Sequence, residues 1–136
     1  MIKTIIFDFG DVFLDLDKAA TKRVLERLDV QNFSEEMLQK NHEYEKGLIT
    51  SEEFIEFYCS SYPQLTSEEF KSSWNAILLK LPEHRLQFLK KLQKEGKYRL
   101  ILLSNTNDIH IDWVKENISC FEEFKNCFDA FYLSQE

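Results

Sequence analysis

The sequence predicts an α/β fold: an incomplete, Rossmann-like parallel sheet that carries an inserted cap of four helices. Three short apolar runs, each stopped by polar turn residues, are typical of buried strands, and helical patterns separate them along the chain. Strands that alternate with helices in this way favour a parallel sheet. The stretch 17–80 holds helical patterns alone, so we expect it to form an insert outside the sheet.

The first predicted strand, 2–7, is short, β-branched and apolar, which is typical of a strand buried on both faces. It stops at 8–11, a polar turn that contains glycine. We therefore assign residues 1–15 and 81–136 to a Rossmann-like core and residues 16–80 to the helical cap.

Residues whose side chains can cap helices divide the insert into four segments. These residues are Asp17, Ser34, Thr50 and Thr66. Thr50 and Thr66 are each followed three residues later by a glutamate, Glu53 and Glu69, which is the capping-box pattern. Apolar residues follow each cap at helical spacing, and the aromatic ones between positions 54 and 74 predict a core inside the cap.

Two further strands alternate with three helices after the cap. A helical pattern ends at Gly96, a residue suited to a helix C-terminus. Apolar runs at 98–103 and 130–133 predict the strands, and shorter helical patterns lie at about 109–115 and 121–125.

Charge and composition exclude several classes of function. The 136 residues include 17 basic and 24 acidic ones, for a formal net charge of −7, and no basic cluster favours binding to nucleic acid. The apolar runs are shorter than the roughly 18 residues of a membrane span. The N-terminus lacks a signal-peptide pattern, and three scattered cysteines do not form a disulfide framework. We therefore expect a cytoplasmic protein with reduced thiols, which binds neither nucleic acid nor membranes.

Polar residues at the ends of two predicted strands are the candidate functional residues. In open parallel sheets, ligands bind beyond the carboxyl ends of the strands. Asp8 stands at one such end, where a carboxylate can act as a nucleophile or bind a hard metal ion. Gly10 lets backbone N–H groups approach an anion, and Ser104 and Asn105 offer neutral hydrogen-bonding groups at the next strand. We expect Asp8 and Ser104 to face one anion-binding pocket.

The segments 5–12 (IIFDFGDV) and 102–107 (LLSNTN), with the long helical insert between them, resemble the haloacid dehalogenase-like (HAD) hydrolase superfamily. Segment 5–12 is similar to the motif that bears the nucleophilic aspartate of that family, and segment 102–107 is similar to the motif that ends the next strand with Ser or Thr. The pattern is similar to that of the sugar phosphatases and of the N-terminal domain of epoxide hydrolases. The resemblance runs from residue 1 to residue 136.

The resemblance implies a Mg²⁺-dependent phosphatase of small phosphorylated metabolites. By it, Asp8 is the catalytic nucleophile and forms an aspartyl-phosphate. Asp8 and the carbonyl of Gly10 are the implied ligands of the metal ion. The backbone of Phe9 and Gly10, together with Ser104 and Asn105, is implied to hold the phosphoryl group.

The sequence departs from the family pattern in two places. Gly10 stands where many of these phosphatases have a second aspartate that acts as general acid and base, and it is open whether Asp11 takes this role. The third-motif Lys or Arg and the fourth-motif acidic pair would follow residue 136. We therefore expect a chain that is impaired or inactive by itself, with an unpaired sheet edge through which it could self-associate.

Two alternatives to the phosphatase stay open. In a haloacid dehalogenase Asp8 would attack carbon without a metal ion, although that branch usually has a bulky residue in place of Gly10. In a non-catalytic remnant, the cap or the open sheet edge would serve binding or oligomerisation. We expect Asp15 to lie in the hinge of the insert. The histidines, which show no metal-ligand spacing, are expected at the surface or at an interface. They are His42, His84 and His110.

Overall fold

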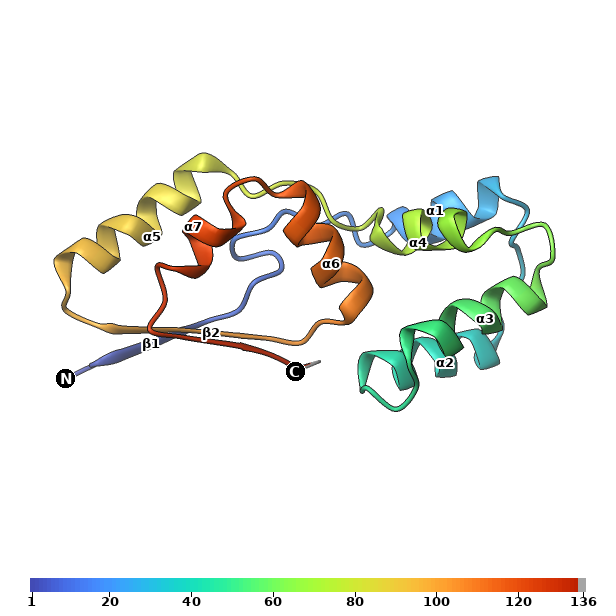
Figure 1. Ribbon diagram of the computed structural model, residues 1–136, viewed down its shortest axis with the longest axis horizontal. Coiled ribbons are helices and arrows are strands. Elements are labelled where there is room, and N and C mark those ends of the chain that lie inside the picture. The colour runs from blue at the N-terminus through green and yellow to red at the C-terminus, as the bar shows by residue number, and fades with distance from the viewer. Residues whose placement is uncertain (135–136) are drawn as a thin grey trace.

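The computed structural model describes residues 1–134 and confirms the α/β fold with a helical insert (Figure 1). In chain order the elements are β1 (Thr4–Phe7), α1 (Ala20–Arg27), α2 (Glu35–Glu45), α3 (Ser51–Ser61), α4 (Ser67–Asn75), α5 (Glu83–Glu95), β2 (Arg99–Ser104), α6 (Asp108–Asn117), α7 (Phe121–Lys125) and β3 (Ala130–Leu133). None of the helices between residues 1 and 134 combines the length and apolar character that a membrane crossing requires.

The strands form a parallel sheet in the order β1-β2-β3. Ile6 pairs with Ile101, and Ile101 in turn pairs with Ala130. Because all three strands run in one direction, their carboxyl ends meet at one edge of the sheet. Helices α5, α6 and α7 lie on one side of this sheet, and the four helices of the insert lie beyond its carboxyl edge (Figure 1).

The prediction that the first strand is buried on both faces is wrong. Side chains alternate between the two faces of a strand. Leu100 and Leu102 face helices α5 to α7 and are fully buried, whereas Ile6, Leu103 and Tyr132 are 61%, 57% and 55% exposed. Within residues 1–134 the helical layer covers a single face, so the apolar side chains on the other face remain in contact with solvent.

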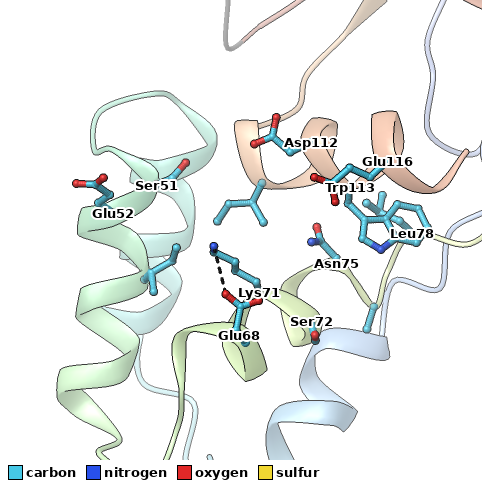
Figure 2. Close-up of a pocket in the computed structure, with 13 residues that line it drawn as sticks. Ser51, Glu52, Glu68, Lys71, Ser72, Asn75, Leu78, Asp112, Trp113 and Glu116 are labelled. Atoms are coloured by element: carbon cyan, nitrogen blue, oxygen red, sulfur yellow. Dashed lines mark ion pairs between the residues drawn. The ribbon is translucent and has the colours of Figure 1, made fainter. Parts of the chain in front are cut away.

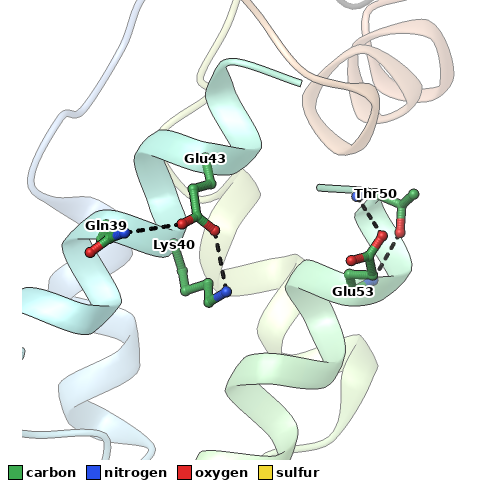
Figure 3. A network of polar contacts seen from close by, with 5 residues as sticks. All are labelled: Gln39, Lys40, Glu43, Thr50 and Glu53. Atoms are coloured by element: carbon green, nitrogen blue, oxygen red, sulfur yellow. Dashed lines mark hydrogen bonds and ion pairs between the residues drawn. The ribbon is translucent and has the colours of Figure 1, made fainter. Parts of the chain in front are cut away.

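Local capping defines the helices of the insert much as the sequence predicts. The Ser34 hydroxyl accepts a hydrogen bond from the N–H of Met37 at the start of α2. Both capping boxes are present, at the starts of α3 and α4. Figure 3 shows the box of Thr50 and Glu53 beside Glu43 of α2, which accepts hydrogen bonds from two neighbours on its own helix.

The prediction that Asp17 caps the first helix of the insert is wrong, because this residue lies in the linker between core and insert, two residues before the helix cap. Helix α1 begins after Ala19, which makes no side-chain cap. The Asp17 carboxylate pairs with Arg23, and this contact lowers the pKa of the exposed carboxyl group. The Asp17 N–H donates to the carbonyl of Ile77 at 2.8 Å, which holds the chain extended ahead of α1.

The two linkers that join the insert to the core pair with each other. The N–H of Asp15 donates to the carbonyl of Lys80 at 2.8 Å, and the N–H of Leu79 donates to the carbonyl of Asp15 at 3.0 Å. Arg85 of α5 binds the Asp15 carboxylate at 2.7 Å and the carbonyl of Phe13 at 3.2 Å. Asp15 therefore has the hinge role expected of it, and the chain passes between core and insert at the boundary that we propose.

The insert has an aromatic core of its own, as predicted. Tyr44 stacks on Phe54, and Tyr58 stacks on Phe70, each pair with ring centroids 4.3 Å apart. Ile109 joins this cluster from α6 of the core. The first turn of α6 is therefore packed into the insert rather than against the sheet alone.

A buried polar network strengthens this junction. The Asn107 side-chain oxygen accepts from the N–H of His110 at 2.9 Å and from the indole N–H of Trp74 at 3.3 Å. His110 Nε2 lies 3.0 Å from the carbonyl of Trp74, so Nε2 carries the proton, and its Nδ1 accepts from the Asn107 amide. The hydroxyl of Tyr44 accepts from the N–H of Ile109 at 3.2 Å. These bonds tie the start of α6 to helices α2 and α4.

Burial lowers the pKa of His110 from 6.5 to about 4, against an opposing hydrogen bond to the Trp74 carbonyl. Between these pH values the unfolded chain binds a proton that the folded chain excludes, so stability is lost as the pH falls through this range. We predict that His110 contributes on the order of 3 kcal/mol to the pH dependence of unfolding.

Urea denaturation of the wild type and of His110→Gln, between pH 7.5 and pH 4, checks this prediction. The free energy of unfolding of the variant should depend less on pH than that of the wild type. His84→Gln is the matched control, since His84 is exposed and should leave the pH dependence unchanged. An equal pH dependence in the wild type and His110→Gln would contradict the assignment.

Candidate active site

The turn after β1 begins with Asp8 and is held by the backbone of Phe9. Oδ1 of Asp8 accepts from the N–H of Phe9 at 2.7 Å. The Phe9 carbonyl accepts from the N–H groups of Val12, Phe13 and Leu14 at 2.9–3.3 Å, which closes a tight turn. The Phe9 ring is buried in the core, so the turn is anchored immediately after the strand ends.

Gly10 lies in close contact with the Leu16 side chain of the hinge. A Cβ atom at this position would lie 2.9 Å from Cδ1 of Leu16, closer than real contacts of this kind. Asp11 follows with a positive φ of 63°, and its carboxylate pairs with Lys18 at 2.9 Å in an exposed position. Asp11 is therefore directed at the start of the insert.

The turn after β2 is fixed by the end of β3. Ser104 is 5% exposed and its carbonyl accepts from the N–H of Ser134 at 3.0 Å. The Ser134 hydroxyl accepts from the N–H of Thr106 at 2.9 Å and lies 3.2 Å from the carbonyl of the same residue. Hydrogen bonds to the residue after β3 thus fix the second candidate turn. Asn107 then caps the start of α6.

The two turns meet at a cavity of about 280 Å³ between the core and the insert. Its lining consists of Phe9, Gly10, Leu14, Leu16, Glu45, Ile77, Leu78, Ser104, Asn105, Thr106, Asn107, His110, Ile111 and Val114. The structure thus brings together four residues that the sequence assigns to phosphate binding: Phe9, Gly10, Ser104 and Asn105. They come from segments far apart in the chain and meet because β1 and β2 are parallel neighbours.

Asp8, the fifth candidate, does not line this cavity, so the expectation that Asp8 and Ser104 face one pocket is wrong in this structure. The register pairs Phe7 with Leu102, so its continuation sets Asp8 level with Leu103 and Phe9 level with Ser104. Because side chains alternate, Asp8 falls on the side of the exposed Leu103, while Phe9 and Ser104 share the buried side. The carboxylate is therefore exposed at the edge of the sheet, one residue before the cavity.

The donors available for a metal ion are few. Residues 1–134 contain no cluster of three or more His, Cys, Asp or Glu side chains with metal-binding geometry. Asp8 uses Oδ1 for the N–H of Phe9, which leaves Oδ2 as one candidate ligand. The backbone carbonyl of Gly10, two residues further along the chain, is the other. Mg²⁺ commonly takes one or two carboxylates and completes its octahedron with water and substrate phosphate, so this donor set suits Mg²⁺ bound together with a phosphate.

A larger cavity, of about 630 Å³, lies between α3, α4 and α6 (Figure 2). Glu52, Glu68, Asp112 and Glu116 line it, and Lys71, which also lines it, pairs with Glu68 at 3.7 Å. This surplus of negative charge opposes the binding of a phosphate. The residues that the sequence assigns to the site lie elsewhere, so the greater size of this cavity does not make it the candidate active site.

The insert supplies lining residues that sequence reasoning missed. Glu45, at the end of α2, and Ile77, in the hinge, line the cavity beside the predicted turns. His110 also lines it, in the interface position expected for a histidine of this chain. Their placement depends on how the insert folds back over the sheet, and helical periodicity carries no signal of that arrangement.

Comparison with curated proteins gives a phosphatase among the relatives of this chain. No family model matches the chain. The D-ribitol-5-phosphate phosphatase of Bacteroides thetaiotaomicron is 30% identical over 135 residues, which cover 93% of this chain. The match covers 61% of that enzyme, so the chain spans about three fifths of its length.

Solved structures agree with this match. A HAD family enzyme of Bacteroides thetaiotaomicron, in complex with magnesium and inorganic phosphate, superposes with a TM-score of 0.84 at 33% identity, over 99% of this chain and 70% of that one. A predicted HAD-like family hydrolase of Porphyromonas gingivalis superposes with a TM-score of 0.76 at 25% identity, over 99% and 67% of the two chains. Given this identity over most of a solved relative, and the two family motifs at one cavity, the chain belongs to the HAD-like hydrolase superfamily.

Proposed function

We propose that the chain carries the nucleophile and the phosphate-binding turns of a Mg²⁺-dependent phosphatase that acts on small phosphorylated metabolites. The observation that carries this proposal is the single cavity lined by Phe9 and Gly10 from one strand end and by Ser104 and Asn105 from the next. The relative named as a D-ribitol-5-phosphate phosphatase, and the neighbour in complex with magnesium and phosphate, support it.

In the proposed reaction, a carboxylate oxygen of Asp8 attacks phosphorus and the bond from phosphorus to the ester oxygen breaks. Water then attacks the phosphorus of the aspartyl-phosphate, which releases inorganic phosphate and restores the carboxylate. The 2.7 Å bond from the N–H of Phe9 keeps the Asp8 carboxylate beside the turn but outside the cavity, so attack requires this side chain to turn toward a phosphoryl group bound at Gly10. The N–H of Gly10 and the hydroxyl of Ser104 would donate to the phosphoryl oxygens as charge develops on them.

Magnesium held by Asp8 and the carbonyl of Gly10 would offset the repulsion between the carboxylate and the phosphate. The leaving alkoxide needs a proton, and Asp11 is directed away from the cavity toward Lys18. We therefore propose that the proton comes from solvent. A positioned general acid is commonly worth about 10²–10⁴ in rate, so turnover should be slow for a phosphatase.

We predict that Asp8→Asn abolishes phosphate release, because an amide cannot attack phosphorus. The assay follows inorganic phosphate released from p-nitrophenyl phosphate and from D-ribitol 5-phosphate, with Mg²⁺ and with a chelator. As expected for a chain impaired by itself, the wild type should release phosphate slowly and only with Mg²⁺. The rate of release by the variant should be lower by at least about 100-fold, the range expected for loss of a catalytic group.

Asp29→Asn is the matched control for this substitution. Asp29 is an exposed aspartate of the insert with a φ of 61°, a conformation that asparagine also tolerates. Its variant should release phosphate at the wild-type rate. Equal rates in Asp8→Asn and the wild type would refute the assignment of Asp8 as the nucleophile. Halide release from a 2-haloacid in the absence of Mg²⁺ would point to a dehalogenase.

We further predict that Ser104→Ala weakens the binding of inorganic phosphate about tenfold. The lost hydrogen bond is made to a charged group, and such bonds contribute roughly 1.5–3 kcal/mol. Ser104→Thr keeps the hydroxyl and should restore affinity. Calorimetric titration with phosphate in the presence of Mg²⁺ measures the effect, and unchanged affinity in Ser104→Ala would remove this residue from the site.

A further inference from the structure

Glu45 occupies a distinctive position among the residues that line cavities. It is the last residue of α2, and it lines the site cavity, a cavity of about 450 Å³ inside the insert, and one of about 400 Å³ at the end of α2. In the third cavity it lies with Lys46 opposite Asn105 and Ser134 of the core. Among the described residues 1–134, no other lines all three of these cavities, so Glu45 stands where they converge.

Within the described part of the chain, Glu45 is also the one acidic residue that lines the site cavity, and no lysine or arginine lines it. The other lining residues are apolar or neutral polar. His110 is neutral near pH 7, because burial holds its pKa at about 4. The candidate phosphate-binding turns contribute Gly10 and Ser104 to this cavity from the core side, and Glu45 lines it from the insert.

Local folding does not account for a glutamate at this position. A carboxylate in the last turn of a helix is disfavoured by the helix dipole. Within residues 1–134 Glu45 makes no ion pair and no side-chain hydrogen bond. The lysines that line the cavity of the insert are engaged elsewhere: Lys18 pairs with Asp11, and Lys22 lies 5.5 Å over the ring of Phe33. The carboxylate is therefore available to a ligand.

We propose that Glu45 determines substrate specificity by accepting hydrogen bonds from hydroxyl groups of the leaving group. An ionised carboxylate only accepts hydrogen bonds, and such charge-assisted bonds are about twice as strong as neutral ones. The same charge repels a second phosphate close to the first. The site would thus take monophosphates of uncharged, polyhydroxylated metabolites. This inference rests on the proposed function, because it takes the phosphoryl group to lie at Gly10 and Ser104.

The test compares binding of four probes to the wild type, Glu45→Gln and Glu45→Ala by calorimetry in Mg²⁺. The probes are inorganic phosphate, a pentitol monophosphate, pentyl phosphate and a pentitol bisphosphate. The wild type should bind the pentitol monophosphate about 10- to 100-fold more tightly than pentyl phosphate. Glu45→Ala should reduce this preference below about threefold, and Glu45→Gln should retain part of it and bind the bisphosphate better. Affinity for inorganic phosphate should be the same in all three.

Glu56→Ala is the matched control, since Glu56 is an exposed glutamate of α3 that lines none of the three cavities. Glu56→Ala should prefer the pentitol monophosphate over pentyl phosphate by the same factor as the wild type. The midpoint temperature of thermal unfolding should be unchanged or slightly higher in Glu45→Ala, because the substitution removes an unfavourable charge at a helix end. Binding of phosphate with an unaltered preference in Glu45→Ala would overturn this inference alone. Failure of the wild type to bind inorganic phosphate would overturn the proposed function and this inference with it.

Discussion

Parallel pairing of β1 with β2 is the constraint on which the candidate site depends. The chain leaves the sheet after β1, folds the whole insert and α5, and then returns to lay β2 beside β1 in the same direction. This arrangement brings two turns that are distant in sequence to one edge of the sheet. The turns hold no exceptional residues, and it is their common edge that gives a glycine and a serine a shared cavity.

The junction between core and insert is built from buried polar groups as well as apolar ones. Asn107, His110 and Trp74 satisfy one another's hydrogen bonds almost completely, with the imidazole in its neutral form. Buried polar groups are costly unless they are paired, so this set is stable only in one relative placement of α4 and α6. The network begins directly after the turn that contains Ser104. The position of the insert and the shape of the candidate phosphate-binding turn are therefore determined together.

The sequence predicts those features that arise from local chemistry. Capping by Ser34, Thr50 and Thr66 depends on side chains and backbone within one turn of helix, and the structure confirms each of them. The expected cap at Asp17 failed because pairing across the hinge, a tertiary contact, outweighs local preference there. The exposure of Ile6 was missed for a related reason: an apolar run shows that a strand can be buried but not which of its faces is covered.

The same division holds for the site. Gly10 and Ser104 could be predicted because strand order in a parallel sheet makes their meeting a matter of topology. Glu45 and Ile77 could not, since their positions depend on how the insert docks. The direction of the Asp8 side chain lies between these cases. It follows from alternation along the strand, but it needs the register, which only the structure supplies.

The paired linkers of the hinge set how the insert can move. Two linkers without contacts between them would let the insert twist and slide relative to the core. Linkers joined by backbone hydrogen bonds move together, so that the insert bends about a single hinge axis. Leu16, on one of these linkers, touches the space above Gly10. Any swing of the insert would therefore change the clearance over the candidate phosphate-binding turn, so that the proposed entry of a substrate and the geometry of its binding would be coupled.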